Sequence, residues 1–270
     1  MYKLFNISNK VLVITGGTGV LGASMVEYLA HHGAKVVILA RNKEKGSQLV
    51  KKVLAAGGEA SFLVTDVNNK EVLEQNKKEI LEKYKKIDIL INGAGGNMPG
   101  ATIGPDKTIF DLNIDDFKTV VDLNLVGTVL PSMVFGSFMT EQKKGSIINI
   151  SSEAALRPLT RVVGYAAAKA AVTNFTKYLA TELATKFGEG LRVNAIAPGF
   201  FITEQNRKLL TNSDGSYTDR GETIIAHTPF GRFGEPEELL GAVHWLSSDA
   251  SKFVTGTLTI VDGGFDAFCI

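Results

Sequence analysis

The amino-acid sequence predicts a doubly wound α/β fold, in which a seven-stranded parallel sheet carries helices on both faces. Short β-branched runs alternate with longer amphipathic stretches, the order typical of strand–helix–strand units. The runs are apolar throughout rather than alternating with polar residues, as expected of strands that are covered on both faces. A glycine-rich turn joins the first run to the first amphipathic stretch.

The expected elements fill one domain that covers residues 1–270. The expected strands are residues 10–15, 35–39, 60–64, 87–92, 146–150, 191–195 and 258–261. The expected helices are residues 22–32, 43–56, 70–84, 114–140, 164–187 and 236–247. Two stretches, 95–111 and 200–235, are irregular, and such segments after strand ends tend to form the ligand crevice. We expect the second stretch to form a lid over a substrate.

Composition and charge argue against several classes of partner. The chain of 270 residues has a formal net charge of +1, which gives no electrostatic reason to expect nucleic acid or a membrane surface. The first residues do not resemble a signal peptide, and no run approaches the roughly 18 apolar residues of a membrane span. The single cysteine, Cys269, excludes an intrachain disulfide. We expect a cytoplasmic protein that acts on a small molecule without a metal.

The turn after the first strand reads TGGTGVLG, from Thr15 to Gly22. Its glycines spell GxGxxG, which permits a tight turn, close approach of the backbone to a pyrophosphate, and close packing of helix on strand. The helix that begins here offers unpaired amides to phosphate groups. A mere glycine turn is the alternative, but the position in the first strand–helix unit favours a dinucleotide. The residues expected to contact it are Gly16, Gly17, Thr18, Gly19, Val20 and Leu21.

The end of the second strand bears on the choice between NAD and NADP. An NAD site normally has an acidic residue about 20 positions after the glycines, where it binds the ribose hydroxyls. This chain has Ala40 and Arg41 there. Arg41, with Lys43, suits a 2′-phosphate, although a solvated loop arginine is the alternative. We therefore expect NADP in preference to NAD.

Two further strand ends supply candidate cofactor contacts. Asp66 ends the third strand and is expected to hydrogen-bond the edge of the adenine ring. Asn92, Ala94 and Gly95, in the sequence NGAG, end the fourth strand, where the nucleoside is expected. A structural role in the turn is the alternative for Asn92, and both roles are compatible.

Tyr165 and Lys169 lie four residues apart at the start of an expected helix, so they share one face. A tyrosine hydroxyl has a pKa near 10 and is a poor base at neutral pH. An ammonium about 5 Å away favours the phenolate by about 3 kcal/mol at an effective dielectric of about 20, which lowers the tyrosine pKa by about two units. The pair therefore suits general acid–base chemistry, although a tyrosine beside a solvated lysine also occurs by chance.

A serine pair after the fifth strand strengthens this interpretation. Ser152 precedes Tyr165 by thirteen residues, so both side chains are expected to converge above the strand ends. A serine hydroxyl there would steady a substrate oxygen while the tyrosine transfers its proton. Ser151 is the alternative within the pair, and a strand-end hydrogen bond is its structural role.

These motifs together resemble the short-chain dehydrogenase/reductase family, which has a Rossmann fold. The resemblance covers residues 10–264 and rests on TGGTGVLG, NGAG, the serine, YAAAK at 165–169 and PG at 198–199, in the family's order and spacing. One position departs from it, because the short-subunit pattern TGxxxGxG has glycine where this chain has Val20. That departure leaves the detail of the phosphate contacts open.

The resemblance implies an NAD(P)-dependent dehydrogenase or reductase and several residue roles. Asn124 matches the helix asparagine that holds a water in the proton relay, and Lys169 would also bind the nicotinamide ribose. Pro198, Gly199 and Thr203 match the segment that holds the carboxamide. A homotetramer is the family's usual assembly. A non-catalytic member that senses the cofactor is the alternative of another class, but such proteins typically lack the tyrosine or the lysine.

The substrate is expected to be a polyhydroxylated anion, because guanidinium groups pair with carboxylates through two parallel bonds. Candidate substrate residues surround the catalytic motif or lie in the 200–235 insertion, and about half of the arginines are expected to pair with the chain's own acids. They are Glu153, Arg157, Arg161, Gln205, Asn206, Arg207, Arg220, His227 and Arg232.

Several phrases, such as RPLTR at 157–161 and APGFFITEQNR at 197–207, resemble family members described as D-mannonate oxidoreductases. The expected reaction is reduction of D-fructuronate to D-mannonate or a close relative. Reduction of a 3-oxoacyl thioester is the alternative.

Overall fold

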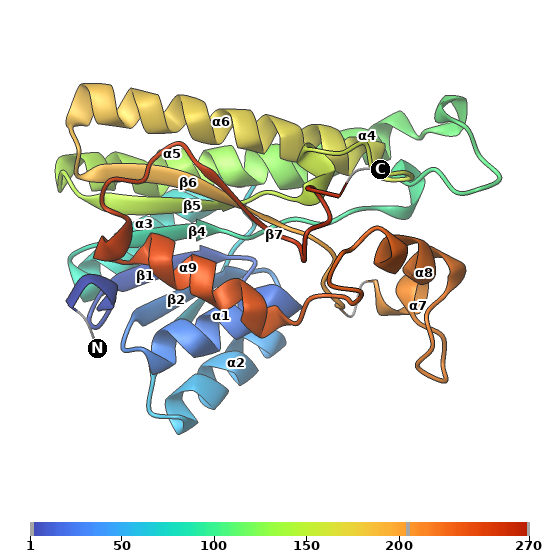
Figure 1. Cartoon of the computed structure of the whole chain (residues 1–270). Helices are drawn as coiled ribbons and strands as arrows, with labels where there is room; N and C mark the ends of the chain where they lie inside the picture. The colour runs from blue at the N-terminus through green and yellow to red at the C-terminus, as the bar shows by residue number, and fades with distance from the viewer. Residues whose placement is uncertain (1–2, 204–205, 269–270) are drawn as a thin grey trace.

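The computed structural model describes residues 3–203 and 206–268, and its centre is a parallel sheet of seven strands. The strands are β1 (Val11–Thr15), β2 (Lys35–Ala40), β3 (Glu59–Val64), β4 (Ile89–Asn92), β5 (Gly145–Ile150), β6 (Leu191–Pro198) and β7 (Leu258–Val261). Their order is β3-β2-β1-β4-β5-β6-β7 (Figure 1). The strands are added in one direction from β1 to β3 and in the other from β4 to β7. The order of the strands therefore reverses between β1 and β4, which is where doubly wound sheets bind ligands. The predicted fold class is confirmed.

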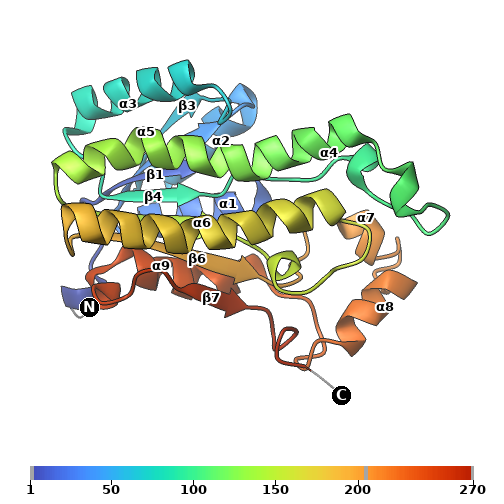
Figure 2. The same cartoon turned by 90° about the horizontal axis from the view of Figure 1, so that it is seen from above.

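Helices cover both faces of the sheet (Figures 1 and 2). The main helices are α1 (Val20–His31), α2 (Lys43–Ala55), α3 (Lys70–Tyr84), α4 (Ile114–Val121), α5 (Gly127–Glu141), α6 (Val163–Phe187), α7 (Arg207–Leu210), α8 (Asp219–Ala226) and α9 (Leu240–Ser247). One hydrophobic core joins the sheet to α1, α2 and α9, and a second joins it to α3, α5 and α6. Both faces of the central strands are therefore buried, as their unbroken apolar runs predict.

Short 3-10 turns lie in the connections. They are η1 (Lys3–Phe5), η2 (Pro99–Ala101), η3 (Ile109–Asp111), η5 (Glu153–Ala155), η6 (Pro236–Leu239) and η7 (Asp249–Ser251). The helix predicted to begin at Pro236 therefore starts as η6 and becomes α-helical only at Leu240.

Helix boundaries follow local capping chemistry. The side chain of Asn42 accepts a hydrogen bond from the amide of Lys45 at the start of α2, and Asn69 caps α3 through the amide of Val72. Such side chains satisfy amides that the first helical turn leaves unpaired. The predicted helix 70–84 is found with the same bounds.

The helix predicted over 114–140 is interrupted. A π-helical turn, η4 (Asp122–Val126), separates α4 from α5, and this turn contains Asn124. By length and composition alone, residues 114–141 could cross a membrane: the most apolar 18-residue window has a mean hydropathy of 1.4, and half of that window is buried inside the molecule. This differs from our expectation that no run reaches that limit, because α5 packs against the sheet, α3 and α6 and is apolar on several sides.

The 200–235 insertion forms a small layer at the carboxyl edge of the sheet, where Figure 1 shows α7 and α8 beyond the strand ends. Its own apolar cluster centres on Leu210, Ile224 and Phe233. A bridge between Thr211 and Tyr217 closes the turn between its two helices. The insertion therefore has a packed structure of its own beside the site.

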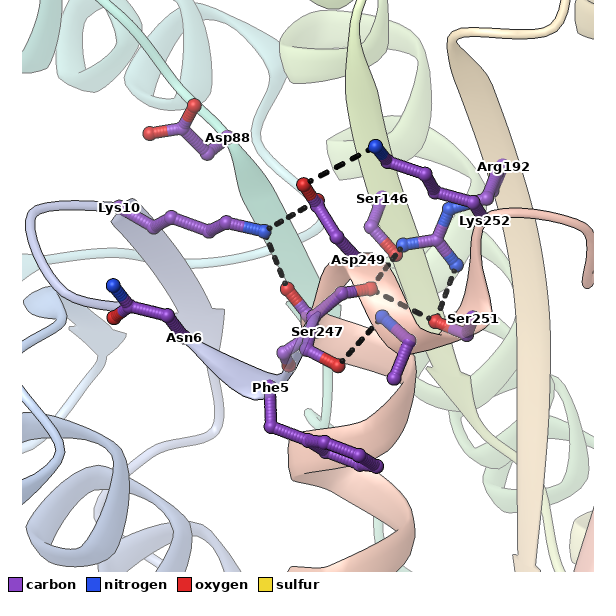
Figure 3. Close-up of polar contacts among 12 residues, drawn as sticks. Phe5, Asn6, Lys10, Asp88, Ser146, Arg192, Ser247, Asp249, Ser251 and Lys252 are labelled. Carbon is purple, nitrogen blue, oxygen red and sulfur yellow. Dashed lines mark hydrogen bonds and ion pairs between the residues drawn. The ribbon is translucent and has the colours of Figure 1, made fainter. Parts of the chain in front are cut away.

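A cationic cluster fastens α9 at the opposite edge of the sheet (Figure 3). Arg192 of β6 is buried, and its Nη2 atom donates to the carbonyl oxygens of Leu246 (3.0 Å) and Ser248 (3.2 Å). Lys10 Nζ donates to the carbonyl oxygen of Ser247 at 3.2 Å. These cations satisfy acceptors that the end of a helix leaves open and complement its dipole.

We expect Arg192→Met to lower the free energy of unfolding by about 1–3 kcal/mol, since it leaves buried carbonyl groups without a donor. Lys252→Ala is the matched control, because Lys252 is exposed and pairs with Asp249 at 3.6 Å; its effect should stay below about 1 kcal/mol. Denaturant unfolding measures both. Equal losses would contradict the role given to Arg192.

Candidate active site

The glycine turn after β1 is fixed against the loop that follows β4. Thr15 Oγ1 accepts hydrogen bonds from the amides of Gly93 (3.1 Å) and Ala94 (3.2 Å). Gly16 has a φ of 68°, and a Cβ atom there would lie 2.6 Å from the carbonyl oxygen of Gly93. Only glycine fits this close approach.

The first turn of α1 has the features of a pyrophosphate site. The helix begins at Val20 after Gly19, and no side chain caps it, so its first amides are left for a ligand. A Cβ atom on Gly22 would lie 2.5 Å from the carbonyl oxygen of Gly16, which shows the close packing that the motif predicts. The turn consists of Gly16, Gly17, Thr18 and Gly19. These features fit a dinucleotide, and the departure at Val20 leaves the turn intact.

The residues expected at the adenosine are exposed at the ends of the neighbouring strands. Arg41 follows β2 directly, next to the helix-capping Asn42. Asp66 follows β3, and its Oδ1 atom accepts from the amide of Asn68 at 3.0 Å. Because parallel strands end at the same edge, both side chains lie on the edge that carries the glycine turn.

The Asn92 side chain joins the end of β4 to its neighbours. Its side chain is buried, and Nδ2 donates to Ser132 Oγ and Asn149 Oδ1, both at 2.8 Å. The amide group therefore ties β4 to β5 and α5. The structural role given above as the alternative is therefore what the side chain shows, and the contact of this segment with the nucleoside stays a prediction.

Gly95 brings Asn124 and Lys169 together. A Cβ atom on Gly95 would lie 2.6 Å from Asn124 Oδ1 and 3.3 Å from Lys169 Nζ. The Asn124 side chain accepts from the amide of Gly96 at 3.2 Å and donates to its carbonyl oxygen at 2.7 Å. Asn124 therefore clamps the NGAG loop through its side chain, a role that the sequence did not indicate. Asn124 lies in the π-helical turn that separates α4 from α5.

Lys169 is buried with its ammonium directed at a strand end. Nζ donates to the carbonyl oxygen of Ile150 at 2.7 Å and lies 5.5 Å from the centre of the Tyr165 ring. The ammonium therefore lies over the face of the Tyr165 ring.

The two serines after β5 have different partners. Ser151 is buried, and its hydroxyl lies 2.7 Å from Thr173 Oγ1, the strand-end role that was its alternative. Ser152 lies beside Tyr165, lowers the pKa of its hydroxyl, and lines the same cavity. Ser152 is therefore the serine of the site.

Burial dominates the titration of the tyrosine and the lysine. It raises the pKa of Tyr165, while the hydrogen bond from Ser152 opposes the rise. It also lowers the pKa of Lys169 to about 8. The expected lowering of the tyrosine pKa by the ammonium is therefore wrong for this chain by itself, since loss of hydration disfavours the phenolate more strongly. Tyr165 therefore keeps its proton at neutral pH.

A cavity of about 350 Å³ lies over Ser152, Tyr165 and Lys169. Leu21, Gly95, Pro198, Gly199 and Thr203 also line it, as the cofactor prediction requires. The sequence patterns did not indicate the apolar part of the lining, which comes from the connection between η5 and α6 and from the 200–235 insertion. These residues are Leu159, Val162, Phe200, Phe201, Leu209 and Leu210. Their apolar character within irregular segments was the available signal.

Most arginines expected at the substrate have other partners or positions. Arg157 pairs with Asp266 at 3.0 Å, and Arg232 makes two hydrogen bonds to Glu238. Arg207 is exposed at the start of α7 and is not part of the cavity lining. The guanidinium groups of Arg157 and Arg232 therefore neutralise the chain's own acids, as expected of about half of the arginines, and their contacts with a substrate stay predictions.

Arg220 of α8 differs from these arginines. It lines the cavity and donates to Thr160 Oγ1 at 3.2 Å, and no carboxylate pairs with it among the described residues. Burial and the neighbouring Arg161 lower the pKa of its guanidinium. The described part of the insertion thus places a cation without an acidic partner in the cavity.

The amide and histidine candidates hold the insertion's own backbone. Asn206 accepts from the amide of Thr203 at 2.7 Å and donates to the carbonyl oxygen of Phe201 at 2.8 Å. His227 is exposed and contacts the carbonyl oxygen of Thr223 at 2.8 Å. Gln205 lies outside the described residues.

Comparisons with known proteins agree with this geometry. The family model described as enoyl-(acyl carrier protein) reductase matches residues 18–266. The chain belongs to the short-chain dehydrogenase/reductase family. It is therefore an NAD(P)-dependent oxidoreductase of CH–OH or carbonyl groups with a Rossmann-like domain.

Three relatives are informative. The uncharacterized oxidoreductase UxuB of Bacillus subtilis is 47% identical over 272 residues, which cover 97% of each chain. A 3-oxoacyl-[acyl-carrier-protein] reductase of Synechocystis is 34% identical and covers 97% of this chain and 99% of its own. A crystal structure of a Haemophilus protein, with D-mannonate oxidoreductase as its suggested activity and with bound NAD, is 41% identical, with a TM-score of 0.91 and coverage of 98% and 97%.

We expect Ser152→Ala to lower kcat by about 10²–10³-fold, the range seen when one donor to a reacting oxygen is removed. Ser151→Ala is the matched control and should leave kcat within about threefold, because its hydroxyl bonds Thr173. Steady-state kinetics with saturating cofactor distinguishes them. A larger loss from Ser151→Ala would reverse the assignment.

Proposed function

We propose that the protein reduces the carbonyl group of a sugar acid, of the D-fructuronate type, with a nicotinamide cofactor. The observation that carries this proposal is Arg220, a guanidinium without an acidic partner among the described residues, in the same cavity as Ser152 and Tyr165. A substrate carboxylate would pair with it through two parallel hydrogen bonds. It would also offset the repulsion between Arg220 and Arg161.

The site residues account for the proton in this reaction. Tyr165 is protonated at neutral pH and gives its proton to the carbonyl oxygen, while Ser152 donates a hydrogen bond to the same oxygen. The Lys169 ammonium would stabilise the phenolate that forms when Tyr165 gives up its proton, and it would also hold the nicotinamide ribose. The cofactor supplies the hydride when bound. Pro198, Gly199 and Thr203 would hold its carboxamide.

The relatives support the sugar-acid class. The Haemophilus structure carries D-mannonate oxidoreductase as its suggested activity. A structure from Beutenbergia cavernae, for which NAD(P)-dependent gluconate 5-dehydrogenase is suggested, is 29% identical, with a TM-score of 0.85 and coverage of 98% and 100%. D-mannonate and gluconate, the compounds in these two suggested activities, are both polyhydroxylated carboxylates.

Reduction of a 3-oxoacyl thioester is the second candidate. It is favoured by the apolar lining from the insertion, Phe200, Leu209 and Leu210, which would contact an acyl chain. The Synechocystis reductase at 34% identity has this activity in its name. Arg220 argues for the sugar acid, because a neutral acyl chain leaves its half-buried guanidinium without a counter-ion.

NADP is the cofactor we propose over NAD. Arg41 is exposed and follows Ala40 at the end of β2. An NAD site would normally have an acidic residue at this strand end, and this chain has none there. The Haemophilus relative contains NAD, and the Beutenbergia relative contains NADP, so both cofactors occur among relatives.

Assembly, location and the lid complete the proposal. A homo-oligomer, the tetramer of the family resemblance, would use the outer faces of α5 and α6 and the edge strand β7. Met133 of α5 and Tyr178 of α6 are exposed there. A cytoplasmic location and closure of residues 200–235 over the substrate remain predictions.

We expect D-fructuronate to be reduced by the wild type, and Arg220→Gln to raise its KM about 10- to 100-fold because a charge-assisted pair is lost. Arg207→Gln, in the same insertion but outside the cavity, is the control and should change KM less than about threefold. Initial rates over a panel of hexuronates and a 3-oxoacyl thioester measure this. Turnover of the thioester alone would replace the proposed substrate, and turnover of neither would contradict both substrate classes.

For the cofactor, we expect the wild type to have a higher kcat/KM with NADPH than with NADH. Arg41→Ala should lower the NADPH value about 10- to 100-fold, the size expected for a charged hydrogen bond, and leave the NADH value nearly unchanged. A wild-type preference for NADH would contradict the role given to Arg41.

A further inference from the structure

Glu153 has an unusual environment for a carboxylate. It follows Ser152 directly, begins η5 and lines the cavity over the catalytic residues. Its side chain is 1% exposed, and neither carboxylate oxygen has a hydrogen-bond partner among the described residues. Leaving a buried charged group unpaired is costly, so a structural role does not account for it.

The neighbouring charged groups are already satisfied. Asp262 accepts from the amides of Gly264 (2.8 Å) and Asp266 (2.6 Å). Asp266 pairs in turn with Arg157 at 3.0 Å. Of the three carboxylates that influence one another here, only Glu153 lacks a hydrogen bond within the described residues.

The charge around Glu153 also selects what it can bind. Asp262 and Asp266 both repel its negative charge, and Arg157 attracts it. A second anion is disfavoured beside these acids, so a substrate carboxylate does not belong here. A hydrogen-bond donor fits beside Glu153, and an uncharged hydroxyl group is the donor that a sugar acid supplies.

We infer that Glu153 is a substrate-binding residue that accepts hydrogen bonds from hydroxyl groups of a polyhydroxylated substrate. These hydroxyl groups would lie close to the carbonyl group on which Ser152 and Tyr165 act. This inference rests on the proposed sugar-acid function and divides the recognition of that substrate. Arg220 takes the carboxylate, and Glu153 takes hydroxyls. It also explains how a cavity with much apolar lining would select a polar substrate.

The inference predicts a pH signature. Burial first, and then Asp262 and Asp266, raise the pKa of Glu153 to about 7, while Arg157 opposes the rise. The ionised form accepts hydroxyl donors more strongly than the neutral form. The kcat/KM for a hydroxylated substrate should therefore fall as the pH drops below about 7. Tyr165 is protonated throughout this range, and Lys169, with its pKa of about 8, affects the alkaline side.

The test compares the wild type with Glu153→Gln, which keeps the shape of the side chain and removes its charge. Glu189→Gln, at an exposed glutamate, is the control for loss of one negative charge. Initial rates with D-fructuronate and with 2,3-butanedione, a carbonyl compound without hydroxyl groups, are measured from pH 5.5 to 8.5 (a range chosen about one to two units around the expected pKa). Thermal unfolding should show Glu153→Gln folded and more stable than the wild type above pH 7, because a buried charge is removed.

We expect Glu153→Gln to raise the KM for D-fructuronate about 10- to 100-fold, to change the butanedione rate less than about threefold, and to abolish the acid limb of the fructuronate profile. An unchanged fructuronate KM and acid limb, or an equal loss with butanedione, would overturn the inference while the proposed function stands. A wild type that reduces 3-oxoacyl thioesters but no hexuronate would overturn both.

Discussion

The burial of the Lys169 ammonium is the constraint on which the rest of the site depends. A charged side chain is expensive to remove from water, and here the carbonyl oxygen of Ile150, 2.7 Å away, accepts its hydrogen bond. Gly95 leaves room for that approach because it has no Cβ atom, and Asn124 holds the loop in place. Loop, strand end and π-helical turn must therefore be positioned together before the lysine can stand beside Tyr165.

The same burial sets the protonation state of the tyrosine. Since it disfavours the phenolate, Tyr165 keeps its proton at neutral pH and is ready to give it to a carbonyl oxygen. The cavity lining then includes two ionisable groups that lack an oppositely charged hydrogen-bond partner among the described residues, the Glu153 carboxyl group and the Arg220 guanidinium. They differ in sign and come from different segments, so a substrate that satisfies both must carry an anionic group and hydrogen-bond donors.

Sequence patterns could predict the sheet, the glycine turn and the catalytic pair, because these depend on local spacing and on unbroken apolar runs. They could not predict the pKa of Tyr165, since its direction depends on how much water the folded chain excludes. Nor could they sort the arginines: Arg157 is neutralised by Asp266, more than a hundred residues away, whereas Arg220 is not neutralised. The side chain of Asn92 likewise shows its buried partners only once β4 and β5 are paired.

The central claim is that Tyr165 supplies the proton for carbonyl reduction, and one comparison of turnover tests it most directly. Tyr165→Phe removes only the hydroxyl, and Tyr178→Phe removes that of an exposed tyrosine on the same helix. With D-fructuronate and saturating NADPH, we expect Tyr165→Phe to reduce kcat by about 10²–10⁴-fold, the usual contribution of a general acid, with cofactor affinity preserved. Turnover within about threefold of the Tyr178→Phe control would contradict it.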